Sequence, residues 1–407
     1  MSVGVERAAA GRPQRPCRFE RSDREKTVSF GERVAGHGGD LVAVRHHLPA
    51  PRLVRYVACI PVRNEADRID RCLSSLWDEF GPQAHILLLV NDSCDETEAI
   101  VSSRIAAGDL SATLVVMRWR DGLGTAPRAR ALAFELAGQI ASEARLFSTD
   151  GDTIVCRGLM KAYDDAFDQG FDLVCGRIGF IPEEALWLTP VDPRRDAAIR
   201  AYRDASREIA SLIFPDSDNP WPHHGNIGGA NFAITADAYR QAGPIPRVPF
   251  GEDRALRRRC EAHGLRILYA DGPRVETSCR LDRSATGGLA AELLRNRTEP
   301  DPVVDEALEA PIRLLRRLRL RHLVEREEDR SRLVVLLVRG GMTPDRAQDI
   351  ADLSNRRMAW FHVEEELASL RRERLAFSAM ERSLPGLLRL RDKIAGAPRG
   401  SLPFREG

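Results

Sequence analysis

The sequence lacks several features that mark common protein classes. Of its 61 basic residues only three are lysines (Lys26, Lys161 and Lys393), which we interpret as a compositional bias of the genome. A formal net charge of +1 excludes the broad basic field that gathers nucleic acid. No aliphatic run approaches the ~20 residues that span a bilayer, and the N-terminus has no signal-peptide apolar core. We therefore expect neither a nucleic-acid partner nor a transmembrane segment.

Cysteine pairs of the C-x-x-C type are also absent. The eight cysteines are scattered along the chain, which disfavours a structural zinc site and a thioredoxin-like motif. Several lie in apolar runs such as "YVACIPV" (56–62), where a reduced cysteine acts as a small core residue. This pattern predicts a reducing, cytoplasmic compartment.

Chain length and the local pattern of apolar and charged residues predict three regions. The chain has 407 residues, more than one compact core holds. Residues 1–50 lack periodicity and predict a flexible segment, 51–290 predict the main domain, and 300–407 read as charged helices. Thr343 before Pro344 indicates a helix N-terminus. The Arg-rich stretch 313–321 predicts a solvated helix face or, less favoured, a contact with phosphate or an acidic membrane.

The main domain alternates between strand-like and helix-like segments. The apolar runs are continuous and short, and a helical pattern follows each of the first four. They occupy residues 55–62, 84–90, 112–119, 145–150 and 171–180. Such alternation predicts an α/β fold with a mostly parallel sheet flanked by helices.

Polar segments follow three of these strands: "RNE" (63–65), "NDS" (91–93) and "TDGD" (149–152). Ligands of open α/β sheets bind beyond the carboxyl ends of the strands, so we expect the three segments to meet at one edge. Asp150 and Asp152 repel each other unless a cation lies beside them. The alternative is an acidic surface turn, because Asp-Gly is a common turn dipeptide.

Six segments resemble, in order and spacing, the motifs of bacterial family-2-like glycosyltransferases with the GT-A fold. The resemblance covers roughly residues 55–280. The segments are "IPVRNE" (60–65), "LVNDSCDET" (89–97), "GTAPRARALAFELA" (124–137), "STDGDT" (148–153), "HGNIGGANFAITADAYRQAGPIP" (224–246) and "FGEDRALRRRCEAHGLRILY" (250–269). It implies a Rossmann-like GT-A domain, here with a C-terminal helical extension. The implied activity is metal-assisted, inverting transfer of a sugar from a nucleotide-diphosphate donor to an acceptor hydroxyl.

The resemblance also implies a metal site and a catalytic pair. Asp152 corresponds to the direct ligand of Mg²⁺ or Mn²⁺, with Asp150 supporting it or the ribose, and oxygen ligands suit these ions. Asp253 corresponds to the general base, and Glu252 is the alternative base or an acceptor contact. The competing interpretation of "GED" is a helix N-terminus, where acidic residues favour the helix dipole.

Further contacts follow from the same resemblance. The donor nucleotide would be bound by Pro61, Arg63, Glu65, Asp92, Arg128, Arg130 and Asp150. Helix capping competes for the two acidic residues at 65 and 92, and a solvated helix face competes for the two arginines of 128–130. The sugar and acceptor would be contacted by Gly229, Asn231, His224 and Trp221. A plain turn and a surface loop are the alternatives for these four.

The sequence departs from the family pattern after its final strand. Many relatives place a histidine ligand there, whereas 275–288 contains none, so metal coordination is weaker or completed by water. A sugar-phosphate nucleotidylyltransferase is disfavoured because no glycine-rich signature follows the first strand. A degenerate nucleotide-sugar-binding module is disfavoured by the intact acidic pairs. Donor, acceptor and oligomeric state do not follow from the sequence, and attachment at the inner membrane face is an alternative to a free cytoplasmic enzyme.

Overall fold

The computed structural model describes residues 23–47, 54–108, 110–122, 124–186, 192–281 and 289–397. The chain divides into two compact units, each considered by itself. Unit 1 comprises Met1–Ile181, Asn226–Arg257 and Leu265–Ser278. Unit 2 comprises Pro182–Gly225, Arg258–Gly264 and Cys279–Gly407.

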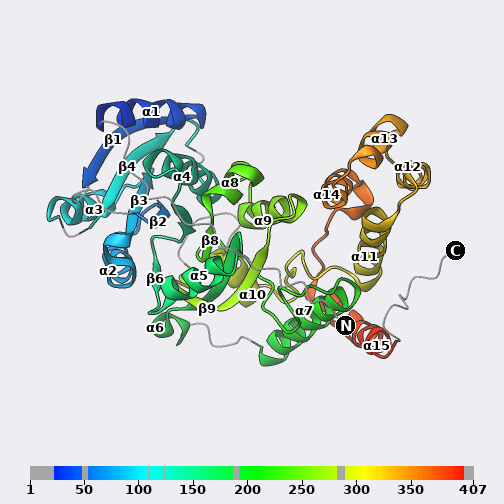
Figure 1. Ribbon diagram of the computed structural model, residues 1–407. Helices are drawn as coiled ribbons and strands as arrows, with labels where there is room; N and C mark the ends of the chain where they lie inside the picture. Colours follow the sequence, from blue (N-terminus) through cyan, green and yellow to red (C-terminus); the bar gives the residue numbers. More distant parts are fainter. Residues whose placement is uncertain are drawn as a thin grey trace, which may run out of the picture. The chain divides into compact units, whose positions relative to one another are not determined.

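Unit 1 is built on one nine-stranded sheet, in the order β1-β4-β3-β2-β5-β8-β7-β9-β6 (Figure 1). The strands are β1 (Gly39–His47), β2 (Tyr56–Val62), β3 (Ala84–Asn91), β4 (Ala112–Trp119), β5 (Arg145–Ser148), β6 (Thr153–Val155), β7 (Leu173–Phe180), β8 (Phe232–Ile234) and β9 (Ile267–Thr277). Only β1, β8 and β6 run against the common direction. The sheet is therefore mostly parallel, which confirms the predicted fold class.

Helices cover both faces of this sheet. On one face, α4 (Ala126–Ile140) packs against β2, β3 and β5, and α1 (Asp23–Gly36) packs against β1 and α4. The other face carries α2 (Ile69–Phe80), α3 (Thr97–Ala106) and α5 (Leu159–Asp168), whose apolar side chains share one core cluster with alternate residues of β2 and β3. Because both faces are covered, every residue of β2 and β3 is buried, which explains their mostly apolar sequence.

The first fifty residues differ from the expectation. Where the structure describes them, they form α1 and β1, and β1 pairs antiparallel with β4 through partners such as Val44 and Val115. Composition alone predicted a flexible segment here. The order comes from tertiary pairing at the edge of the sheet, which a local pattern does not encode.

Unit 2 is helical. Its longer helices are α7 (Pro193–Ile213), α10 (Leu289–Thr298), α11 (Pro311–Arg326), α12 (Arg330–Arg339), α13 (Pro344–Asp352), α14 (Arg356–Glu366) and α15 (Phe377–Ala395). One apolar cluster joins α7, α11 and α15, and a second joins α11 to α14. Thr343 caps α13 by accepting from the backbone N–H of Arg346 at 3.4 Å, which confirms the predicted helix start.

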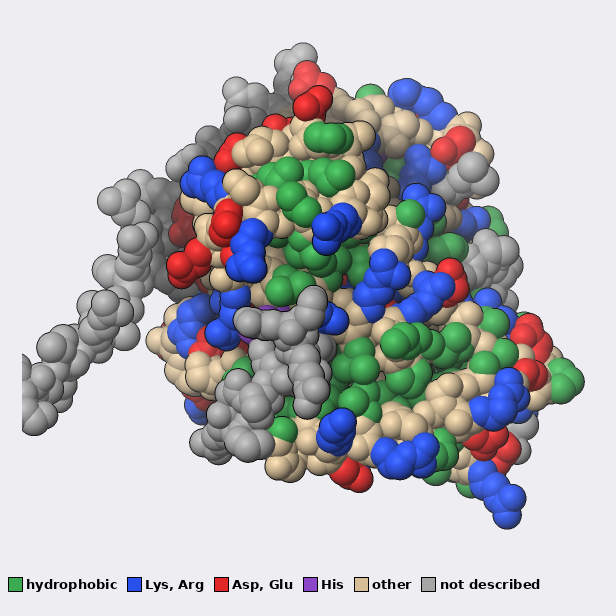
Figure 2. Space-filling model, turned by 90° about the vertical axis from the view of Figure 1, so that its right-hand side faces the viewer, with side chains coloured by type: hydrophobic (Ala, Val, Ile, Leu, Met, Phe, Trp, Pro, Cys, Tyr) green, Lys and Arg blue, Asp and Glu red, His purple; other side chains and the backbone are tan. Residues whose placement is uncertain are grey.

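The surface and the helix lengths add two observations. On the face drawn in Figure 2, basic side chains lie singly or in small groups between apolar and acidic ones. Within the described ranges, no helix combines the length and apolar character needed to cross a bilayer.

Candidate functional site

The polar segments that follow β2, β3 and β5 lie side by side. These strands are adjacent and parallel, so their carboxyl ends share one edge. The backbone N–H of Asn64 donates to Ser93 Oγ at 3.1 Å, and the N–H of Thr149 donates to the carbonyl of Cys59 at 3.5 Å. The predicted convergence of the three segments is therefore confirmed.

Gly151, between the two aspartates, is favoured at this position for steric reasons. A Cβ atom on Gly151 would lie 3.3 Å from both Glu65 Cγ and Val62 Cγ1, closer than most Cβ contacts. The absence of a side chain therefore lets the turn carrying Asp150 and Asp152 press against the end of β2.

Arg130 lies at the centre of the site, with 3% of its surface exposed. Its Nε donates to Glu252 Oε1 at 2.9 Å and its Nη2 to Asp150 Oδ1 at 2.8 Å. Its Nη1 donates to Ser148 Oγ and to the carbonyl of Gly229, both at 2.9 Å. One guanidinium from α4 thus joins the end of β5, the segment before β8 and the start of α9 (Glu252–Ala262).

These contacts keep Arg130 charged and give it partners other than the expected phosphate. Burial alone would lower its pKa, but Asp150 and Glu252 outweigh burial and raise it. The second candidate, Arg128, pairs with Asp121 at 2.8 Å and lies over the Trp119 ring at 4.3 Å. Both arginines are therefore held by protein groups rather than lying on a solvated face without partners.

Gly229 and Asn231, which we expected to contact the sugar, contact other protein groups in this structure. A Cβ on Gly229 would lie 2.4 Å from Arg130 Nη2, so the glycine makes room for the arginine. Asn231 is fully buried. Its amide donates to the carbonyls of Arg177 at 2.8 Å and Pro273 at 3.1 Å, leaving no free amide hydrogen for a sugar.

Asp253 has few partners. It is partly buried, and its Oδ1 accepts from the backbone N–H of Arg254 at 2.6 Å. No side chain among the described residues donates to it in a hydrogen bond or ion pair. Burial, and then the neighbouring Glu252 charge, raise the pKa of Asp253 from 3.8 to about 6, against the opposing effects of the Arg254 N–H, Arg130 and Arg254 charges.

Asp152 lies at the other side of the acidic turn and is 6% exposed. Its Oδ1 accepts from Thr277 Oγ1 at 3.3 Å, and Thr277, at the end of β9, also contacts Thr153 Oγ1 at 3.0 Å. Across the described ranges, no three His, Cys, Asp or Glu side chains come together as a closed metal site. The donor set is two carboxylates, one of them paired with Arg130. It suits an ion that takes its remaining ligands from substrate and water.

Asp92 directly follows β3 and lies in the left-handed region, with φ of 47°. Its Oδ1 accepts from the backbone N–H of Trp119 at 3.1 Å. Its Oδ2 is buried and has no hydrogen-bond partner within the described residues. Since buried acceptors are normally satisfied, this oxygen is suited to receive a donor from a ligand.

The remaining donor-site candidates differ in accessibility. Pro61 is buried inside β2, so it shapes the strand rather than facing a ligand. Arg63 is exposed, and its Nη1 donates to the carbonyl of Gly124 at 3.1 Å. Glu65 is 3% exposed, and its backbone N–H donates to Thr97 Oγ1 at 2.8 Å. The sequence analysis assigned no role to Trp119 or Thr277, although each ends a strand at this edge.

Trp221 and His224 belong to unit 2. His224 is 8% exposed, and the Trp221 ring lies edge-on to His223 with centroids 5.8 Å apart. Their expected contact with the acceptor stays a prediction.

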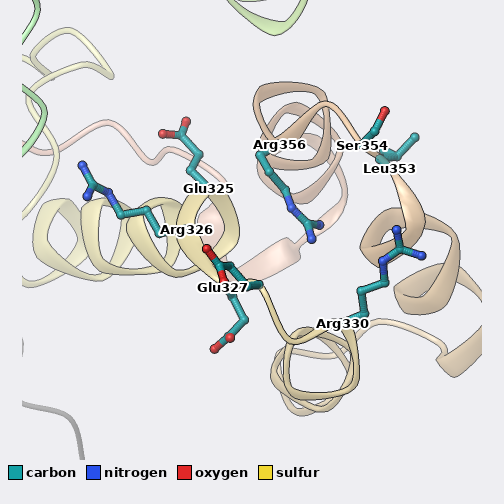
Figure 3. A pocket seen from close by; sticks show the side chains of 8 residues that line it. Glu325, Arg326, Glu327, Arg330, Leu353, Ser354 and Arg356 are labelled. Carbon is teal, nitrogen blue, oxygen red and sulfur yellow. The ribbon is translucent and has the colours of Figure 1, made fainter.

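A separate pocket of about 610 Å³ lies within unit 2, between the end of α11, the start of α12 and the α13–α14 connection. Figure 3 shows Arg356 pointing into this space and Arg326 pointing away from it. Arg330, also on its wall, pairs with Asp352 at 3.2 Å. Acidic and basic groups alternate around the pocket, so it has no single-charge character that would indicate a ligand.

Comparison with known proteins adds a family match. Residues 57–204 match the family model described as glycosyl transferase family 2. The match contains Asp92, Arg130, Asp150 and Asp152, and it ends before Glu252. A comparison with curated protein sequences gave no significant match.

Several solved structures are similar at low identity. A mannosyltransferase (PcManGT) from Pyrobaculum calidifontis, in complex with GDP-Man and Mn²⁺, is 16% identical, with 93% of this chain and 84% of that chain covered and a TM-score of 0.42. Residues 1–349 of TarS from S. aureus, in complex with UDP-GlcNAc, are 13% identical, with coverages of 77% and 91% and a TM-score of 0.41. Glucosyl-3-phosphoglycerate synthase from Mycobacterium tuberculosis, with Mg²⁺ and UDP, is 13% identical, with coverages of 66% and 81% and a TM-score of 0.37.

The family match covers β2 to β5 and both carboxylates of the acidic turn. Over residues 57–204, this chain therefore carries a glycosyltransferase segment of glycosyl transferase family 2.

Proposed function

We propose that this glycosyltransferase transfers a sugar from a nucleotide-diphosphate donor to an acceptor hydroxyl, with inversion at the anomeric carbon. The observation that carries the proposal is Asp253, a carboxylate that has no side-chain partner among the residues the structure describes and whose pKa is raised to about 6. A base with a pKa near the working pH abstracts protons most effectively. Arg130 connects its neighbour Glu252 to the acidic turn, which supports a single site for the base and the donor contacts.

Asp253 removes the proton from the acceptor hydroxyl as its oxygen attacks the anomeric carbon. The bond from that carbon to the donor diphosphate breaks in the same displacement, so the configuration inverts. The nucleoside diphosphate leaves with the electron pair of the broken bond.

A divalent cation fits the acidic turn as a partner of the substrate. Asp152 would hold Mg²⁺ or Mn²⁺, supported by the Asp150 oxygen that Arg130 does not bind. Mg²⁺ typically takes one or two carboxylates together with substrate phosphates and water. When bound, such an ion neutralises the charge that develops on the leaving diphosphate.

The nucleotide would bind at the ends of β2 and β3. Asp92 Oδ2, which has no hydrogen-bond partner in the described part of the chain, suits an N–H of the base. The exposed Arg63 suits a phosphate or ribose oxygen. Arg128 could reach a phosphate only by exchanging Asp121 for it.

We place the reaction in a reducing, cytoplasmic compartment. None of the seven cysteines within the described residues is bonded to another of them, which supports this location. Membrane attachment through the arginines of 313–321 is less favoured, because Arg317 is buried and Arg321 pairs with Glu325 at 2.8 Å.

The proposal is tested by calorimetric titration of UDP and GDP, each with and without Mn²⁺, on the wild type and on Asp152→Asn. We expect Mn²⁺-dependent binding of one nucleotide that the substitution abolishes. Hydrolysis of the corresponding nucleotide sugar by the purified protein would then establish turnover. Binding unaffected by both Mn²⁺ and Asp152→Asn would contradict the metal-assisted mechanism, and no binding or turnover with any donor would contradict the transfer itself.

A further inference from the structure

We propose that Arg130 is a positioning residue that divides the four carboxylates of the site between two tasks. Through ion pairs it fixes Asp150 and Glu252 in place. The chemistry is thereby left to Asp152 and Asp253. The inference rests on the proposed function and deepens it.

The geometry of the Arg130 guanidinium supports a positioning role. All three nitrogens of Arg130 donate to protein oxygens, at distances of 2.8 to 2.9 Å. The accepting groups come from segments distant in sequence, so one side chain aligns the acidic turn with the start of α9. Gly229 is shaped for this arrangement, because a Cβ there would collide with the guanidinium.

The contacts of Glu252 and Asp253 favour Asp253 as the base. Glu252 is 6% exposed and its Oε1 is bound to Arg130 Nε. A proton taken up by Glu252 would remove the charge that this buried ion pair needs. Asp253 is not held in this way, since within the described residues its hydrogen bond comes from a backbone N–H. Asp253 can therefore accept and release a proton without disrupting the site.

The position of Arg130 also distinguishes Asp150 from Asp152 as a metal ligand. Asp150 Oδ1 is 2.8 Å from a guanidinium nitrogen, and a second cation close to that oxygen would be repelled by Arg130. The hydrogen bond to Asp152 Oδ1 comes from a neutral hydroxyl, that of Thr277. Direct contact with Arg130 therefore opposes a divalent ion at Asp150 Oδ1, which favours Asp152 as the carboxylate that takes the ion.

A purely structural arginine would stabilise the fold without assigning these tasks, so the test uses readouts that stability does not move. In the kinetic arm, Arg130→Lys, Glu252→Gln and Asp253→Asn are compared by hydrolysis of UDP-glucose, UDP-N-acetylglucosamine and GDP-mannose. Lysine keeps the charge but not the array of donors. The matched control is Arg145→Lys. Arg145, on β5, is buried like Arg130 and pairs with a different carboxylate, that of Asp164, at 2.5 Å.

We expect Arg130→Lys to lower kcat by about 100-fold with KM within about threefold, and Arg145→Lys to leave kcat unchanged. Glu252→Gln should retain kcat within about tenfold. It should also shift the acidic limb of kcat/KM to lower pH, because Arg130 and Arg254 would then be the charged groups facing Asp253. Equal loss in Glu252→Gln and Asp253→Asn, or an unchanged kcat in Arg130→Lys, would overturn the assignment.

The second arm needs no turnover, so it separates this inference from the proposed function. Mn²⁺ alone is titrated calorimetrically into the wild type, Asp150→Asn and Asp152→Asn. We expect Asp152→Asn to weaken Mn²⁺ binding at least tenfold and Asp150→Asn to change it less than threefold. Equal weakening by both substitutions, or no Mn²⁺ binding by the folded wild type, would overturn the division of tasks even if donor hydrolysis is observed.

Discussion

Arg130 and Glu252 are 122 positions apart, yet Arg130 Nε donates to Glu252 Oε1 across 2.9 Å. Arg130 lies inside the family 2 match of residues 57–204, and Glu252 lies beyond its end. The contact therefore ties the matched segment to a part of the chain that the match does not reach. The polar network around Arg130 extends beyond the matched segment.

The first prediction concerns the base. Asp253→Asn should lower kcat by ~10²–10⁴-fold, the usual contribution of general-base catalysis. The amide keeps the shape of the side chain, so nucleotide affinity and thermal stability should stay close to those of the wild type. Steady-state donor hydrolysis and calorimetry measure both quantities. An activity loss below about tenfold would mean that another group removes the proton.

The second prediction is a pH dependence. Because the pKa of Asp253 is raised to about 6, its carboxylate forms only above that pH. We expect kcat/KM to rise about tenfold per pH unit below pH 6 and to level off above it. The stability contribution has the opposite sign. The folded state holds this proton more tightly than the unfolded chain, whose value is 3.8, so that contribution is present below about pH 4 and is lost as the pH rises through 6. A flat profile between pH 5 and pH 7 would contradict the assignment.

Sequence reasoning predicted that the three polar segments converge because strand ends are local signals. The segments after β2, β3 and β5 each follow a strand-like stretch, and the parallel fold brings such ends together. The antiparallel strand β8 is only three residues long. Its pairing with β5 and β7 arises from tertiary contacts, which short apolar stretches do not reveal.

The contacts of Arg130 and Gly229 differ from the expected ones, because their partners are distant in sequence. Arg130 reads as a helix-surface residue that could reach a phosphate. Its partners, Asp150 and Glu252, are distant in sequence, and no periodicity identifies them. Gly229 reads as a turn glycine for the same reason, since the side chain that needs its space comes from α4. Long-range polar pairing decides these tasks.

The third prediction tests the space beside Arg130. Gly229→Ala places a methyl group 2.4 Å from Arg130 Nη2, and overpacking of this kind costs about 1–3 kcal/mol. The control is Gly138→Ala on α4, where no atom lies within 4 Å of the new Cβ; a helical glycine replaced by alanine gains about 0.5–1 kcal/mol. Denaturant unfolding should show opposite signs for the two variants. Equal effects would mean that Arg130 moves aside without cost.

The fourth prediction concerns the core of unit 2. Arg317 is buried and donates to both carboxylate oxygens of Glu309, at 2.9 and 3.0 Å, and to Glu364 Oε1 at 2.7 Å. Arg317→Ala leaves two largely buried carboxylates without their cation, and breaking such a pair costs about 3–5 kcal/mol. The adjacent Arg316 is exposed, so Arg316→Ala should change stability by less than about 0.5 kcal/mol.

The two arginines of this pair differ in burial rather than in chemistry, so the comparison isolates the buried ion pairs. Unfolding should be followed by a probe in unit 2, such as the fluorescence of Trp360, which is 7% exposed in its apolar cluster. Equal, small losses would mean that water reaches Glu309 and Glu364 once the arginine is removed. A large loss for Arg317→Ala alone would show that α11 is held by these buried charges, because its apolar face by itself would survive the substitution.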